Sequence, residues 1–208
     1  MARIAGSDGE VTRSEIRKVS LSLFAQYGYA AVSMRQIASQ VGVQASAIYQ
    51  YYPNKQQILV SLLQNHMDGL LSACHEEITA KDPVDRLEQF ARFHIRYNIN
   101  RPDEVFLSYM ELRSLEPEGF ATIADLRSKY EAVLKSILRD GIKSGVMKID
   151  DPHVSAMAIL AMLTGVNTWY RSGGRLSQKK IENMYASMVL KSQGIVPKNH
   201  DEKEAAHV

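Results

Sequence analysis

The chain has 208 residues, of which 45% are hydrophobic and 23% charged, with a net charge of +2. This composition is typical of a globular protein of one or two domains, and it excludes a disordered or fibrous chain. Charges interrupt every long apolar segment, which excludes a membrane-spanning run of roughly 18 residues. The single cysteine, Cys74, excludes a disulfide within the chain, so we expect a cytoplasmic protein.

The charge is unevenly distributed along the chain. Residues 1–60 carry six basic and three acidic side chains, whereas residues 61–195 carry equal numbers of both signs. Local positive charge of this kind attracts nucleic acid, although a solvated helix face has the same pattern.

Hydrophobic residues recur at helical spacing throughout the chain, and no segment alternates as a β-strand does. The spacing predicts helices over about 12–27, 34–40, 45–51, 55–79, 84–94, 103–115, 123–137, 152–170 and 178–192. Local signals support several ends: Gly28 as a left-handed cap, a Ser33/Gln36 capping box, and Asp151 as an N-cap before Pro152. The fold class that we expect is therefore all-α.

The second and third helices are separated by the tight turn Val41-Gly42-Val43, which is the spacing of a helix-turn-helix motif over 33–52. Ile37, Ala38, Val41 and Ile48 can pack inside, and the third helix then presents its other face outward. That face holds short or uncharged hydrogen-bonding groups suited to a DNA major groove. They are Gln44, Ala45, Ser46, Tyr49 and Gln50. An ordinary three-helix bundle remains the alternative at this point.

The stretch LFAQYGYAAVSMRQIASQVGVQASAIYQYYPNKQQIL resembles the N-terminal domain of the TetR family of bacterial repressors. The matching residues are Phe24, Tyr27-Gly28-Tyr29, Ser33, Ile37-Ala38, Val41-Gly42-Val43, Tyr49, Tyr51-Tyr52 and Lys55. Two positions depart from the family pattern: Gln44 stands where a capping Ser or Thr is usual, and Ser46 where Gly is common. Both lie on the expected DNA face, so the resemblance does not predict which DNA sequence this protein recognises.

The resemblance implies a role for each residue on this face. Ser33, Tyr49 and Lys55 are expected to contact phosphates, and Arg35 either phosphates or bases. Gln44, Ser46 and Gln50 are expected to read bases, with Ala45 beside them. For Tyr51, contact with DNA and packing in the protein core are both open.

The resemblance also implies how the chain is divided. We expect a flexible arm at 1–9, a three-helix DNA-binding domain at 10–55, a helical effector-binding and dimerisation domain at 56–195, and a flexible tail at 196–208. The family pairs two copies through its last two helices. The segment 154–170 is apolar around most of its circumference, which suits a homodimer interface or, alternatively, burial within one subunit.

Charged and aromatic residues occur among the apolar helices of the second domain. Buried charges are costly unless they are paired, so these residues form either internal networks, such as Glu111 with Arg113, or the mouth of a pocket. The expected ligand-binding residues are Arg92, Arg96, Tyr109, Arg113, Arg127, Tyr130 and Trp169.

Two C-terminal stretches, FLSYMELRSLEP and MLTGVNTWYRSGGRLS, are similar to TetR-type repressors of lipid and acid catabolism. The similarity implies an acyl-CoA effector, with arginines for its phosphates and Trp169 for its adenine. A hydrophobic drug-like effector is the alternative.

Motifs typical of enzymes are missing from the sequence: it has no G-x-S-x-G, H-E-x-x-H, P-loop or dinucleotide-binding fingerprint. We therefore expect no catalysis, no cofactor and no metal site. The expected partners are a near-palindromic double-stranded DNA operator, a small-molecule effector and a second copy of the chain. A helical ligand-binding adaptor without DNA function is the competing hypothesis.

Overall fold

The computed structural model describes residues 5–195, with side chains from residue 9 onward, and every regular element in that range is helical. The elements are α1 (Ala5–Tyr27), α2 (Met34–Val41), α3 (Ala45–Ile48), α4 (Lys55–Glu77), α5 (Pro83–Ile99), α6 (Pro102–Met110), η1 (Leu112–Ser114), α7 (Pro117–Lys143), α8 (Pro152–Thr164), α9 (Val166–Trp169) and α10 (Gln178–Ser192). The all-α prediction is confirmed. Residues 1–4 of the expected arm and the whole expected tail at 196–208 lie outside the described residues.

Contacts divide the chain into two compact units. Of the described residues, the first takes in 5–71 together with Arg101–Ser128, and the second takes in Ser72–Asn100 and 129–195. The long helices α4 and α7 each contribute residues to both units. Within residues 5–195, no helix is both long and apolar enough to cross a membrane.

Local signals fix the helix-turn-helix. At the start of α2, the Ser33 hydroxyl accepts from the Gln36 backbone N–H, and the Gln36 side chain accepts from the Ser33 backbone N–H at 2.7 Å. At its end, Gly42 has a φ of +81°, a left-handed conformation that favours glycine, and its N–H donates to the carbonyl of Ala38. The predicted capping box and the predicted turn are both confirmed.

Most helix bounds differ from those predicted: α5 extends to Ile99 rather than 94, α6 ends at Met110 rather than near 115, and α7 runs Pro117–Lys143 rather than 123–137. Helix α1 begins at Ala5 rather than near Thr12. Helix α3 ends at Ile48, and the next residues continue in tighter turn bonds such as Gln50 N–H to the Ala47 carbonyl. The apolar helix predicted over 152–170 is interrupted at Gly165, a residue of low helix propensity, so that α8 and α9 are separate.

The first unit has one apolar core beneath the helix-turn-helix. Helix α1 packs on α2 and on α6, and α2 packs on α3. The buried side chains that join them are Ile16, Phe24, Val32, Ile37, Ala38, Ile48, Tyr52, Ile58, Leu59, Leu62, Leu63, Leu107 and Ile123. Because Ile37, Ala38 and Ile48 all point inward, the opposite face of α3 points to solvent.

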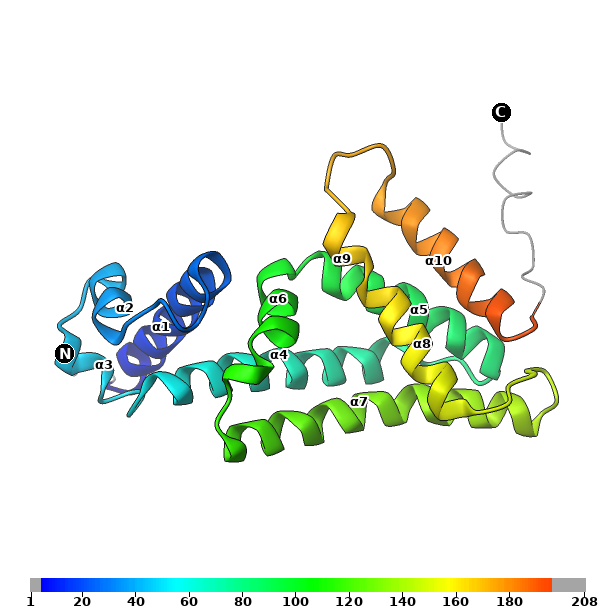
Figure 1. Ribbon diagram of the computed structural model, residues 1–208, viewed down its shortest axis with the longest axis horizontal. Coiled ribbons are helices and arrows are strands. Elements are labelled where there is room, and N and C mark those ends of the chain that lie inside the picture. The colour runs from blue at the N-terminus through cyan, green and yellow to red at the C-terminus, as the bar shows by residue number, and fades with distance from the viewer. Residues whose placement is uncertain (1–4, 196–208) are drawn as a thin grey trace. The chain divides into compact units, whose positions relative to one another are not determined.

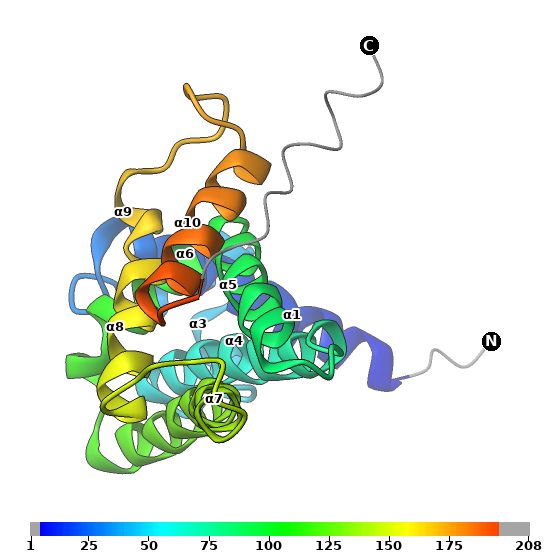
Figure 2. The ribbon, with the colours of Figure 1, turned by 90° about the vertical axis from the view of Figure 1, so that its right-hand side faces the viewer.

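In the second unit, α5 lies at the centre of the packing. Helices α8, α9 and α10 all contact α5, and Figures 1 and 2 show α10, the orange helix, alongside α5. Asp151 caps α8 by accepting from the backbone N–H groups of His153 and Val154, and Ser177 caps α10. The Asp151 cap was predicted.

Candidate nucleic-acid interface

Helix α3 presents polar side chains to solvent over a buried anchor. Ile48 is fully buried, whereas Tyr49 is 52% exposed and Gln44, Ser46 and Gln50 are also exposed. Ala45 is half-buried. Gln44 stands at the N-cap of α3, but in the described structure its side chain makes no hydrogen bond that caps the helix. Its amide is therefore available to an outside molecule. We call Gln44, Ser46, Tyr49 and Gln50 the recognition surface.

The start of α2 adds two exposed residues, Ser33 and Arg35. The Ser33 hydroxyl donates to Gln36 Oε1 at 2.9 Å as well as accepting from the Gln36 N–H. A phosphate that accepts from Ser33 would therefore replace a bond within the capping box. Contacts of both residues with DNA stay predictions.

Lys55, at the start of α4, is bonded within the protein. Its ammonium donates to the carbonyls of Tyr29 and Val32, each at 2.7 Å, and lies 4.2 Å from the centre of the Tyr29 ring. Burial lowers the pKa of this ammonium, and the Glu111 carboxylate acts in the opposite direction. Its contact with phosphate stays a prediction, and the geometry adds a second task, which is to hold the turn between α1 and α2.

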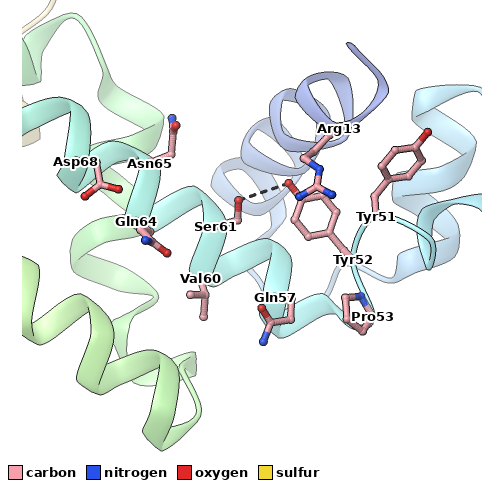
Figure 3. Close-up of a pocket in the computed structure, with 10 residues that line it drawn as sticks. All are labelled: Arg13, Tyr51, Tyr52, Pro53, Gln57, Val60, Ser61, Gln64, Asn65 and Asp68. Carbon is pink, nitrogen blue, oxygen red and sulfur yellow. Dashed lines mark hydrogen bonds between the residues drawn. The ribbon is translucent and has the colours of Figure 1, made fainter. Parts of the chain in front are cut away.

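A groove of about 320 Å³ is lined by α1, the turn after α3 and the first half of α4. Figure 3 shows Arg13 over the ring of Tyr52, at 5.7 Å from its centre, and the Tyr52 hydroxyl bonded to Ser61. Its other lining residues are Tyr51, Pro53, Gln57, Val60, Gln64, Asn65 and Asp68. This mainly polar lining does not suit an acyl chain. Tyr51 also packs against the core, as the packing alternative expected.

Among the predicted ligand residues, two arginines of α5 have partners inside the second unit. Arg92 donates to Glu88 at 2.7 Å and to Asn183, and Arg96 pairs with Glu77 and, at 3.0 Å, with Glu182. A ligand phosphate would have to compete with these carboxylates. The arginines therefore stabilise the packing of α5 against α10 before any ligand binds.

Tyr130, another predicted ligand residue, belongs to a buried polar cluster in the second unit. Its hydroxyl lies 3.0 Å from His94 Nδ1, and His94 Nε2 lies 3.0 Å from the Thr164 hydroxyl and 2.9 Å from Asn98 Nδ2. Within the described chain, Asn98 Oδ1 is buried without a hydrogen-bond partner. The His94 cluster (His94, Asn98, Tyr130 and Thr164) is thus a polar site with one unused acceptor inside an apolar unit.

The remaining predicted ligand residues lie in separate places. In the first unit, the Arg127 guanidinium lies 5.1 Å from the centre of the Tyr109 ring and donates to the Ser108 carbonyl, and Arg113 is exposed. In the second unit, Trp169 is exposed and stacks on Tyr185. In place of the pair of Glu111 with Arg113, the Glu111 carboxylate accepts from the Tyr29 backbone N–H and from the Ser114 hydroxyl.

Together, the helix-turn-helix with its exposed polar helix and the separate helical unit define a DNA-binding regulator. Residues 16–62 match the family described as bacterial regulatory proteins, tetR family, and residues 80–192 match the tetracyclin repressor-like C-terminal domain. The second match alone spans more than half of the chain, and the chain belongs to the TetR family of transcriptional repressors.

Three relatives illustrate the similarity. The HTH-type transcriptional repressor KstR2 of Mycobacterium tuberculosis is 23% identical over 91% of this chain and 96% of its own length. The fatty acid metabolism regulator protein of Bacillus subtilis is 28% identical over 85% of this chain and 92% of its own length. The crystal structure of AibR in complex with isovaleryl coenzyme A and operator DNA has a TM-score of 0.78 and 25% identity, covering 85% of this chain and 97% of AibR.

Proposed function

We propose that the protein represses transcription from a near-palindromic operator and leaves it when an acyl-CoA thioester binds the second domain. The observation that carries the proposal is the likeness, over 85% of the chain, to a regulator whose structure holds both an acyl-CoA and operator DNA. The recognition surface supports the DNA half, because exposed amides and hydroxyls match the hydrogen-bonding groups of the major groove. Such a repressor acts on the chromosome, in the cytoplasm.

The His94 cluster supports the effector half of the proposal. It lies at α5, α7 and α8, among the buried side chains of Phe90, Leu134 and Leu163. A ligand with an apolar chain and a carbonyl group would bury the chain in such surroundings and place the carbonyl beside the hydroxyl and imidazole groups. The phosphates of CoA would then bind at exposed arginines of the same unit, such as Arg171 or Arg175.

We further propose that the protein acts as a homodimer through α8 and α10, with the domain division 10–55 and 56–195 kept from the sequence. Both helices pack on α5 with one face and expose apolar side chains on the other. We call Val154, Met184 and Met188 the apolar surface, and Met188 is 45% exposed. Two copies joined by a two-fold axis require a two-fold operator.

The experiment begins with a DNA duplex selected from a random pool by the wild-type protein. Isovaleryl-CoA and longer acyl-CoA thioesters are then compared with the matching free acids for release of that duplex. A thioester that prefers the released conformation 100-fold supplies about 2.7 kcal/mol, which is enough for a clear shift in affinity. Release by free acids or hydrophobic cations alone would contradict the acyl-CoA proposal, and selection of no duplex would contradict DNA binding.

The His94 cluster provides a matched pair of variants for this measurement. Thr164→Val removes a buried hydroxyl that forms a hydrogen bond with His94. Thr168→Val makes the same substitution at an exposed residue, whose hydroxyl donates only to the Gly165 carbonyl in the described structure. We expect the first variant to bind the thioester more weakly and the second to bind it normally. Equal thioester affinity in both variants would move the effector site away from this cluster.

A further inference from the structure

Two turns that are far apart in the sequence are bonded to each other in the first unit. One turn, residues 29–32, connects α1 to α2, and the other, residues 111–116, connects α6 to α7. Glu111 is 8% exposed, and both of its carboxylate oxygens are used: Oε1 accepts from the Tyr29 backbone N–H at 3.0 Å and Oε2 accepts from the Ser114 hydroxyl at 2.6 Å. The carboxylate therefore joins the backbone of the first turn to a side chain of the second.

Gln56, in the first turn of α4, makes a second link between the same turns. Its amide nitrogen donates to the Tyr29 hydroxyl at 2.9 Å and to the Ser114 carbonyl at 2.5 Å, and its amide oxygen accepts from the Glu116 N–H at 3.2 Å. The neighbouring Lys55 holds the carbonyls of Tyr29 and Val32. We call the side chains of Lys55, Gln56 and Glu111 the turn clamp.

The clamp fixes the backbone that leads directly into the recognition motif. Val32 is followed by Ser33, the N-cap of α2, so the direction of the turn sets where α2 begins. A side chain that supplies the acceptor for a partly buried N–H is costly to remove, because the donor then loses its bond without regaining water. Without the clamp, the turn would have to be ordered again each time DNA binds.

The clamp also joins the two domains that the family comparisons define. Tyr29, Lys55 and Gln56 fall within the N-terminal match at 16–62, whereas Glu111, Ser114 and Glu116 fall within the C-terminal match at 80–192. Any movement of residues 111–116 must therefore break these bonds or carry the turn at 29–32 with it.

We propose that Glu111 is a positioning residue for DNA binding: through the turn clamp, it sets the start of α2 from within the C-terminal domain. The proposal rests on the DNA-binding function of α2 and α3. It requires no contact between Glu111 and DNA.

The test compares Glu111→Ala with Glu116→Ala on the duplex selected by the wild-type protein. Each variant removes one carboxylate from the same turn, but the Glu116 side chain is exposed and only its backbone N–H takes part in the clamp. Loss of a negative charge by itself strengthens binding to the DNA polyanion. We expect Glu116→Ala to bind equally well or more tightly, and Glu111→Ala to bind about 10-fold more weakly, since its Tyr29 N–H lacks an acceptor.

A third variant and a second readout separate positioning from loss of fold. Glu111→Gln keeps an oxygen for the Tyr29 N–H, and we expect it to bind DNA as the wild type does. In folded Glu111→Ala, amide hydrogen exchange should accelerate at residues 28–33 while the interior of α1 and α4 stays protected. Normal DNA binding by Glu111→Ala, or the same change in both alanine variants, would overturn this proposal alone. A wild type that selects no duplex would overturn the DNA-binding function with it.

Discussion

The recognition surface and the apolar surface are both exposed, but their chemistry is opposite. On α3, the exposed groups are amides, hydroxyls and one aromatic ring, set on the buried Ile48. On α8 and α10, the exposed large apolar side chains are Val154, Met184 and Met188. Water already solvates the first set well, so a partner must offer matching hydrogen bonds, as DNA does. The second set gains by leaving water, so its expected partner is another apolar protein surface.

The largest effect is expected from a charge on the apolar surface. Met188→Asp would place an unpaired carboxylate in the proposed dimer interface, and we expect the dimer to dissociate at least about 100-fold more readily. Sedimentation of the purified protein at micromolar concentration measures this. Val146→Asp is the matched control, because Val146 is similarly exposed (43%) in the turn after α7. Sedimentation of the wild type as a monomer would refute the dimer itself.

The anchor beneath the recognition surface should matter more for stability than the surface does. Ile48→Ala removes a fully buried side chain, and we expect unfolding to become easier by about 2–5 kcal/mol. Ser46→Ala, on the exposed face of the same helix, should change stability by less than about 0.5 kcal/mol. Denaturant unfolding of both variants gives the comparison, and a large loss from Ser46→Ala would mean that this face is not open to solvent.

Acid should lower the stability of the folded protein through a buried group rather than through either exposed surface. Burial, together with the guanidinium groups of Arg101 and Arg127, lowers the pKa of His66 to about 4. The unfolded chain, with a pKa near 6.5, binds the proton first, so stability is complete above about pH 6.5 and is lost as the pH falls towards 4. The loss attributable to His66 is about 3 kcal/mol. Denaturant unfolding between pH 4 and 7 should show that the free energy of unfolding depends less steeply on pH in His66→Gln than in the wild type. The same pH dependence in both proteins would contradict the lowered pKa of His66.

The smallest effects separate base reading from phosphate binding. Gln44→Ala should reduce the free-energy preference for one base over the others by about 1–3 kcal/mol at one position of the operator. The stability of the protein should not change, because the side chain takes no part in the described α3 cap. Tyr49→Ala should instead weaken binding to all DNA sequences equally. It should also reduce the salt dependence of the binding constant by the amount expected for about one lost phosphate contact. Competition binding with single-base variants at several salt concentrations distinguishes the two. Identical profiles for both variants would contradict the division of roles.

The sequence predicted the features whose signals are local. Ser33 with Gln36, Gly42, and Asp151 before Pro152 each act within four residues, and the structure confirms all of these helix ends. The resemblance then supplied the family. The turn clamp was not predicted, because Tyr29 and Glu111 are 82 residues apart and neither residue reveals its partner. One signal was present: Glu111 is an acidic residue in an apolar segment, which requires a bonding partner.

The partners of some charged residues are hidden from the sequence in the same way, because they lie on another helix. Arg92 and Arg96 were predicted to bind a ligand, and this stays a prediction; in the structure Arg92 pairs with Glu88, one helical turn before it, and Arg96 pairs with Glu182. Nothing in the local pattern around α5 indicates that Glu182, on α10, would lie beside Arg96. Pairing across helices depends on the packing of the whole unit, which a single sequence does not display.

The turn clamp has a consequence for protein engineering. Repressors with new inducers are built by fusing the DNA-reading part of one regulator to the sensing part of another, and the usual junction would fall between the two matched domains, at residues 63–79. In this protein, such a fusion would separate Gln56 and Tyr29 from Glu111 and bring in a foreign residue at that position. A working chimera would need the residues of 111–116 to be transplanted together with the DNA-reading part, although they lie far beyond the junction.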